Sequence, residues 1–275
     1  MLTPRPPKGV KGEQDRGSTL NTIISCASTN NYPKHFVWSY YKTKFKNFLM
    51  PLFFTQSLAI LQKDLRMEWR TKERLSAMAF FAFLVVLIFN FAFQPGSPVM
   101  KTAAPGIFWI ATTFAGLLGL SRSFAIEKQN DCLMGLRLTP ADSGAIFLGK
   151  MLGNAITMLI LEALILPILI IFLNLEITQA IPKLLLPILF GTLGFAAVGT
   201  LFSAMSINTK LQEALLPILT LPILIPALLA AIESFRAIFA GDALSDITDW
   251  LTLGGAFAGL FCAACLLLFE YVLED

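Results

Sequence analysis

The chain has 275 residues, of which 56% are hydrophobic and only 14% are charged, and its mean hydropathy is +0.69. A soluble domain is roughly 45–50% apolar and about 25% charged, so this chain has too little charge to cover a globule with polar surface. Part of its surface must therefore face lipid, and disorder over most of the length is excluded. The formal net charge is only +3, which by itself says nothing about nucleic acid. From the apolar composition we expect the lipid bilayer as a partner, and we expect no nucleic acid.

The first part of the chain differs from the rest. Residues 1–48 are polar, with clusters of Pro, Gly, Ser and Asn and no hydrophobic period. They fit a disordered tail or translation assigned upstream of the true start, for which Met50 is a candidate, and their basic, acid-poor composition would also suit a transit peptide. We predict that residues 1–55 are a disordered or mis-assigned extension and that residues 56–275 form the folded membrane domain.

An amphipathic helix is predicted between Gln56 and Arg74. Its apolar residues recur at helical spacing, while several cations occupy the other faces. The apolar residues are Leu58, Leu61, Leu65 and Trp69, and the cations include Lys63, Arg66 and Arg70. Such a helix is expected to lie in the inner membrane interface with its cations towards anionic headgroups. The alternative is a soluble helix that packs on a partner.

Six later stretches are long and apolar enough to cross a bilayer, whose core of about 30 Å requires roughly 20 residues of helix. They are residues 76–93, 105–124, 151–173, 184–205, 214–232 and 250–269. Each is continuously apolar, which favours helices over the alternating strands of a membrane barrel. The predicted fold class is an all-α integral membrane protein with six transmembrane helices.

The positive charges give the orientation of these spans. One set of connections contains most of them: Lys63, Arg66, Arg70, Lys72 and Arg74 before the first span, Arg122, Lys128, Arg137 and Lys150 between the second and third, and Lys210 between the fourth and fifth. The opposite connections contain only Lys101, Lys183 and Arg236. The positive-inside rule therefore predicts that both termini are cytoplasmic.

A P-loop-like motif is rejected by its context. Residues 144–150 match the first seven positions of the motif, but Met151 stands where Ser or Thr would hold magnesium. The segment runs directly into an apolar span, and no strand precedes it. We expect Gly149 and Gly153 to form a small-residue contact between helices instead.

A CxxC motif is rejected for a similar reason. Cys262 and Cys265 lie within an apolar span, with no histidine or second cysteine pair nearby. We expect small residues of this span, including Gly255 and Gly259, to pack against neighbouring helices.

Glu162 is the one carboxylate in the middle of a predicted span. An ionisable residue inside a membrane is costly and suggests a function. The alternative is a protonated or hydrogen-bonded side chain buried between helices. Both interpretations stay open, because one acid alone defines no ion pathway.

The connection from Ser121 to Lys150 is the longest predicted cytoplasmic loop. Leucines lie there among charged residues, which predicts a short amphipathic helix that Pro140 ends, with Asp142 or Ser143 capping the next helix. A helix of this kind can dock into a groove on a partner. The candidate contact residues are Glu127, Leu133, Leu136, Arg137, Leu138 and Pro140.

Six spans, an interfacial N-terminal helix and a coupling helix in the first cytoplasmic loop resemble the membrane subunits of type-2 ABC exporters. Within that group three segments narrow the match: residues 104–111 at the start of span two, Arg122 and Phe124 before the loop, and the Leu-Pro-x-x-x-Pro stretch of residues 221–226. In these segments the sequence is similar to the CcmB family, haem exporter protein B of cytochrome c maturation. The resemblance covers about residues 56–275, with departures at Asn130 and Cys132.

This resemblance implies a permease-like, non-catalytic subunit that works with a separate CcmA-type ATPase and with CcmC, CcmD and the haem chaperone CcmE. ATP hydrolysis by the partner would drive haem export or the release of haem-loaded CcmE. The implied location is a bacterial cell inner membrane, with a mitochondrial inner membrane less favoured. The alternatives are a general type-2 ABC permease that exports lipid, drug or polysaccharide, and a secondary transporter, which should show paired intramembrane charges and an internal repeat.

Haem iron requires axial ligands such as histidine or a cysteine thiolate. The single histidine of the chain, His35, lies in the polar N-terminal part. We therefore expect no catalytic, metal or cofactor site in this chain, with ATP and haem handled by partner subunits.

Overall fold

The computed structural model describes residues 52–94, 96–129, 142–174, 181–206, 212–242 and 244–274. These residues are helical apart from short turns and contain no β-strand. The described helices are α3 (Leu52–Thr71), α4 (Glu73–Ala92), α5 (Pro98–Gln129), α7 (Ser143–Phe172), α8 (Ile181–Ser206), α9 (Gln212–Ala240) and α10 (Leu244–Glu274). The predicted extension, residues 1–55, lies almost wholly outside the described residues.

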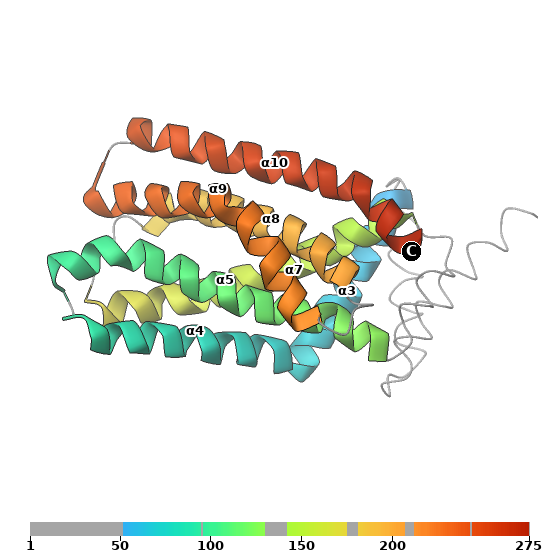
Figure 1. Cartoon of the computed structure of the whole chain (residues 1–275), viewed down its shortest axis with the longest axis horizontal. Helices are drawn as coiled ribbons and strands as arrows, with labels where there is room; N and C mark the ends of the chain where they lie inside the picture. Colours follow the sequence, from blue (N-terminus) through green and yellow to red (C-terminus); the bar gives the residue numbers. More distant parts are fainter. Residues whose placement is uncertain are drawn as a thin grey trace, which may run out of the picture.

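The six helices from α4 to α10 form a bundle and run along its long axis (Figure 1). All six are long and apolar enough to cross a membrane. The start of α4 and the end of α10 lie at the same end of the bundle, where α3 also lies, and we call this the α3 end. The six-span, all-helical fold class is confirmed, and its even number of spans brings both ends of the described chain to the same side.

The centre of the bundle is formed mainly by α5 and α8, which are largely buried, whereas α4 and α10 expose most of their surface. On α5, Phe108 and Trp109 pack against Phe235 of α9, with ring centroids 5.1 and 5.6 Å from that ring. Large apolar residues are exposed around the outside, including Phe91 and Leu267. A continuous apolar exterior is expected where the surrounding solvent is lipid.

Several helices are longer than the predicted spans. Helix α5 begins at Pro98 and not at 105, α7 begins at Ser143 and not at 151, and α9 continues to Ala240 and not to 232. Hydropathy marks the apolar part of a helix, but a helix ends where its backbone groups are capped. At the start of α7 the Asp142 side chain accepts a hydrogen bond from the Gly144 N–H at 2.8 Å, which confirms Asp142 as a predicted cap.

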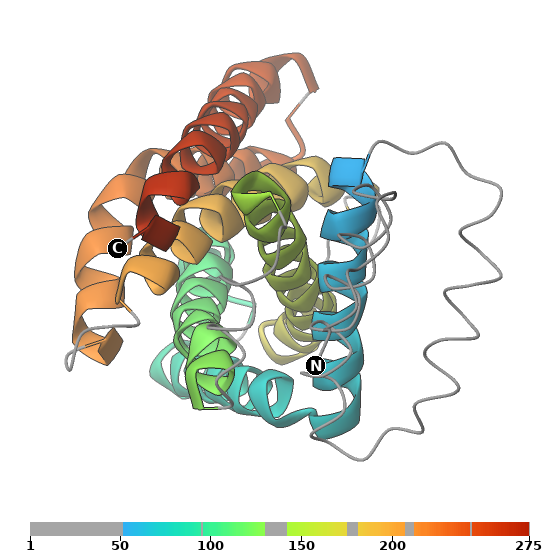
Figure 2. The ribbon, with the colours of Figure 1, turned by 90° about the vertical axis from the view of Figure 1, so that its right-hand side faces the viewer.

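A left-handed residue separates α3 from α4. Lys72 has φ 52 and ψ 10, a conformation that is uncommon outside glycine. The chain changes direction there, so that α3 lies across the end of the bundle while the spans are seen end on (Figure 2). The predicted helix over residues 56–74 is therefore present as a separate element, and it begins earlier and ends at Thr71.

The two faces of α3 have different surroundings. Phe54, Leu58 and Trp69 are 54%, 45% and 70% exposed on the face that points away from the bundle. Ser57 and Ile60 are buried on the opposite face, which packs on α7. The exposed stripe contains two of the leucine and tryptophan residues predicted to form an apolar, interfacial face.

Candidate functional site

The predicted coupling residues fall at the edge of the described structure. Glu127 lies in the last turns of α5, which continues through it without a break to Gln129. Glu127 is thus part of the second span's helix, whereas the prediction grouped it with a separate helix. Its predicted neighbours lie outside the described residues, so the coupling helix stays a prediction; they are Leu133, Leu136, Arg137, Leu138 and Pro140.

A glycine seam joins α7 to α3. A Cβ added at Gly149 would lie 2.7 Å from the backbone oxygen of Ser57 and 2.9 Å from the Cβ of Ile60. A Cβ at Gly153 would lie 3.6 Å from the Cβ of Asp64. The predicted small-residue contact of Gly149 and Gly153 is therefore confirmed, and its partner helix is α3.

The other rejected motifs also lie within helices. The P-loop-like residues 144–150 are turns of α7 and do not form a phosphate-binding loop. On α10, a Cβ added at Gly255 would lie 3.5 Å from the ring of Phe190, but a Cβ at Gly259 would meet nothing within 4 Å, so that part of the packing prediction is wrong. The Cys262 sulfur lies 3.7 Å from the Met151 sulfur.

An ion pair lies beside the glycine seam. Lys150 is only 2% exposed, and its ammonium nitrogen is 3.1 Å from Asp64 Oδ2 of α3. Lys63 Nζ lies 3.2 Å from Asp64 Oδ1. Burial by itself raises the pKa of the Asp64 carboxyl, but the charges of Lys150 and Lys63 outweigh burial and hold this pKa below its ordinary value of 3.8.

A second ion pair follows one helical turn further along α3. Arg74, at the start of α4, is 8% exposed, and its Nε donates to Glu68 Oε2 at 3.0 Å. Its other guanidinium nitrogens donate to two residues of α7, Nη1 to Asn154 Oδ1 at 2.9 Å and Nη2 to Thr157 Oγ1 at 2.7 Å. Glu68 Oε1 also accepts from the Leu75 N–H at 2.8 Å, so both carboxylate oxygens are used.

The network continues into α8, because Asn154 Nδ2 donates to Thr200 Oγ1 at 2.9 Å. Four helices, α3, α4, α7 and α8, are thus connected at the α3 end by buried polar groups. We call this set the charge ladder; its members are Asp64, Glu68, Arg74, Lys150, Asn154, Thr157 and Thr200. Buried ionic groups at membrane depth are costly unless paired, so each member depends on its partners.

The charge ladder was not predicted, because Arg74, at the end of the predicted amphipathic helix, and Lys150, in a predicted loop, were interpreted only as cytoplasmic charges that set the orientation. They are instead buried within helices, where they pair with acids of α3. A signal was present: Asp64 and Glu68 are four residues apart and so share one helix face, next to Leu61. The periodicity of the leucines alone predicted an apolar face and left these acids without a role.

Glu162 lies deeper in the bundle, on α7, and is 1% exposed. Its two carboxyl oxygens are 2.9 and 2.7 Å from the hydroxyl oxygen of Thr192 on α8. A hydroxyl has one hydrogen to donate. Two contacts of this length are therefore best satisfied when the Thr192 hydroxyl donates a hydrogen bond to one carboxyl oxygen and accepts a hydrogen bond from the other. The arrangement is that of a hydrogen-bonded side chain buried between two helices.

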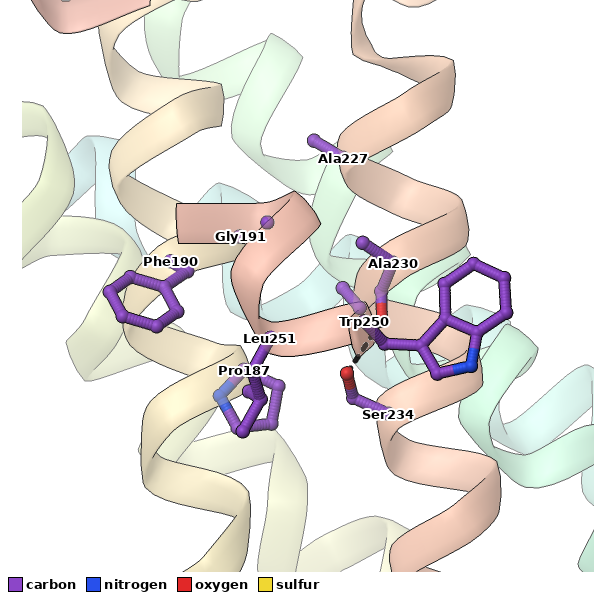
Figure 3. A pocket seen from close by; sticks show the side chains of 10 residues that line it. Pro187, Phe190, Gly191, Ala227, Ala230, Ser234, Trp250 and Leu251 are labelled. Atoms are coloured by element: carbon purple, nitrogen blue, oxygen red, sulfur yellow. Dashed lines mark hydrogen bonds between the residues drawn. The ribbon is translucent and has the colours of Figure 1, made fainter. Parts of the chain in front are cut away.

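A small pocket lies between α8, α9 and α10 (Figure 3). It is lined by Pro187, Phe190, Gly191, Ala227, Ala230, Ala231, Ser234, Trp250, Leu251 and Gly254. The Ser234 hydroxyl donates to the Ala230 carbonyl of its own helix at 2.7 Å, and no lining residue is charged or is an axial ligand for haem iron. Across the described part of the chain, no three His, Cys, Asp or Glu residues are grouped so that they could hold a metal ion.

Comparison with known proteins identifies the family. The family model described as CcmB protein matches residues 55–269. Heme exporter protein B of Pseudomonas aeruginosa is 28% identical over 192 residues, which are 70% of this chain and 86% of that protein. The proteins of the same name from Rhodobacter capsulatus and Bradyrhizobium diazoefficiens are 30% and 25% identical, over 65% and 76% of this chain and 81% and 96% of their own lengths. This chain, a multi-pass membrane protein of six spans, belongs to the CcmB family.

Proposed function

We propose that this chain is the permease-like membrane subunit of an ABC transporter complex for c-type cytochrome maturation. A separate CcmA-type ATPase would hydrolyse ATP, and this chain would couple that hydrolysis to haem export or to release of haem-loaded chaperone CcmE. The observation that carries the proposal is the family match over residues 55–269, together with several relatives named Heme exporter protein B.

The part that this chain plays is mechanical. The P-loop-like residues 144–150 are helical, and the ionic groups of the charge ladder are paired with one another inside the bundle. Groups that pair in this way between helices hold those helices together. We therefore assign ATP binding and hydrolysis to the partner subunit.

The proposed setting is a bacterial inner membrane with both termini in the cytoplasm. The Lys and Arg residues of α3 and of the adjoining ends of α4, α5 and α7 lie at the α3 end, where the described chain begins and ends (Figure 1). In this orientation the end of α5 and the start of α7, which flank residues 130–141, face the cytoplasm. CcmC, CcmD and CcmE are the further partners that the family resemblance implies.

Co-purification from membranes tests the proposal. The tagged full chain, extracted in mild detergent, should bring a CcmA-type ATPase with it. Leu136→Asp places a charge on the apolar face of the predicted coupling helix and should reduce the recovered ATPase by about tenfold or more, because a buried interface charge without a partner is costly. Leu136→Ile is the matched control and should retain it. Normal ATPase recovery and normal cytochrome c yield with Leu136→Asp would contradict the assigned interface.

Haem content provides a second measurement. The purified subunit alone should contain no stoichiometric haem, because we assign haem to its partners. Absorption spectra after incubation with haem and gel filtration would measure this directly. Haem that stays bound at one equivalent per chain would overturn the assignment of haem to the partner subunits.

A further inference from the structure

We propose that α3 is a fixed brace of α7: α3 and the N-terminal part of α7, residues 142–157, move as one rigid body while the ATPase acts. This inference rests on the proposed function, because it describes how movement at residues 130–141 would be passed into the bundle. The contacts along α3 support this rigid attachment. The sequence predicted α3 only as a helix lying in the membrane interface.

On α7, the contact between the two helices includes Asp142, the residue that caps the start of this helix. The backbone N–H of Asp142 donates to Gln56 Oε1 of α3 at 3.3 Å. One turn further along α3, Ser57 and Ile60 are buried against the backbone of Gly149. The helices are therefore in contact from the residue that directly follows residues 130–141.

The glycine seam prevents sliding of one helix along the other. Even a single added carbon at Gly149 would approach the Ser57 carbonyl oxygen to 2.7 Å, so backbone touches backbone there. Interfaces packed this closely have discrete arrangements and do not deform continuously. A shift of α3 along α7 would drive Ile60 into the adjoining turn.

The charge ladder prevents separation. Moving α3 away from α7 would leave Lys150, which is 2% exposed, without Asp64. It would also separate Glu68 of α3 from Asn154 of α7, which are linked because Arg74 donates a hydrogen bond to each of them. Breaking a buried pair leaves uncompensated charges and is strongly unfavourable. The brace thus stays attached during any movement that does not also supply new partners.

A disulfide between the two helices can test this, because the geometry at Gly153 suits one. A Cβ at residue 153 would lie 3.6 Å from the Cβ of Asp64, within the range of about 3.5–4.5 Å found in disulfides. The variant is Asp64→Cys with Gly153→Cys, and Lys150→Met is added so that no buried cation is left unpaired. The native cysteines are replaced by serine or alanine in the variant and in its control; they are Cys26, Cys132, Cys262 and Cys265.

The oxidised and reduced forms are compared as the complete complex in membranes. We expect the rates of ATP hydrolysis and of release of haem-loaded chaperone to agree within about twofold between the two forms. A disulfide between two helices that do not move apart restricts no step of the cycle. A loss of about tenfold or more on oxidation, with the ATPase still bound and the loss reversed by reductant, would show that α3 leaves α7 during the cycle and would overturn the brace. Failure of the unmodified chain to bind an ATPase would instead reject the proposed function.

A second pair of variants covers the case in which the cysteine variant does not assemble. Asp64→Leu takes the carboxylate away from the buried Lys150 and should lower the amount of assembled protein by about tenfold or more. Lys150→Met leaves Asp64 only its pair with Lys63 and should also lower the amount of assembled protein. The double variant Asp64→Leu with Lys150→Met should recover most of it, because no charge is stranded at this contact. Equal losses in the double and single variants would show that the two residues do not act as a pair and would overturn the brace.

Discussion

Glu162 and Thr192 hold α7 to α8 through a pair of contacts that a neutral amide can also make. We predict that Glu162→Gln keeps normal cytochrome c yield, within about twofold, because the Gln side chain can donate to and accept from the Thr192 hydroxyl. Thr192→Val should lower the free energy of unfolding by about 1–3 kcal/mol, since it leaves a buried carboxyl without its partner. Thr192→Ser is the control and should be close to neutral.

The same variant separates the two interpretations of Glu162. A role in moving protons or ions requires a group that titrates, and glutamine does not. Loss of cytochrome c yield in Glu162→Gln with unchanged amount and thermal stability of the protein would therefore contradict a purely structural role and point to ion or proton movement.

Asp64 gives the charge ladder a defined pH dependence. Its folded-state pKa lies below the ordinary value of 3.8, so its ion pairs contribute fully above pH 3.8, and this contribution is lost as the pH falls through the folded-state pKa. At neutral pH, Asp64→Asn should cost about 3–5 kcal/mol, because Lys150 stays buried without the Asp64 carboxylate. Thermal unfolding should show the difference from the wild type shrinking only below pH 3.8.

Asp249→Asn, at an exposed position of α10, is the control and should show no such convergence. If the stability difference caused by Asp64→Asn shrank instead between pH 5 and pH 7 (about the range in which histidine titrates), a group other than Asp64 would control the pair.

At the scale of elements, alanine substitutions at two glycines of α7 should have different effects on stability. Gly149→Ala should lower stability by about 1–3 kcal/mol, because the added carbon would meet backbone atoms of α3 that cannot rotate away. Gly153→Ala, one turn further along, meets its nearest neighbour at 3.6 Å, an ordinary contact, and should be tolerated. Thermal unfolding of the two purified variants, with Gly259→Ala as an exposed control, checks this. No loss of stability in Gly149→Ala would show that the helices are further apart than the structure places them, and an equal loss in Gly153→Ala would show that they are closer at residue 153.

Across the elements, sequence and structure agree where one physical signal dominates. Long apolar stretches must become helices in a membrane, so all six spans could be predicted, and Asp142 could be predicted as a cap from its position before a helical run. The charge ladder could not, because pairing of Lys150 with Asp64 depends on α3 folding back across α7, which no local pattern encodes. A Lys beside an apolar stretch has the same appearance whether it faces water or a buried acid.

The whole molecule makes a prediction about orientation in the membrane. The described chain begins and ends at the α3 end, which is also the end rich in Lys and Arg, so both termini should be cytoplasmic. Green fluorescent protein fused after Asp275 should fluoresce, and alkaline phosphatase fused there should be inactive. Phosphatase inserted after Asp242, in the connection of α9 and α10 at the opposite end of the bundle, should be active because that connection lies outside. Reversed activities at both sites would place the charge ladder and Glu127 on the outer side, where no ATP is available, and would remove the physical basis for coupling to an ATPase.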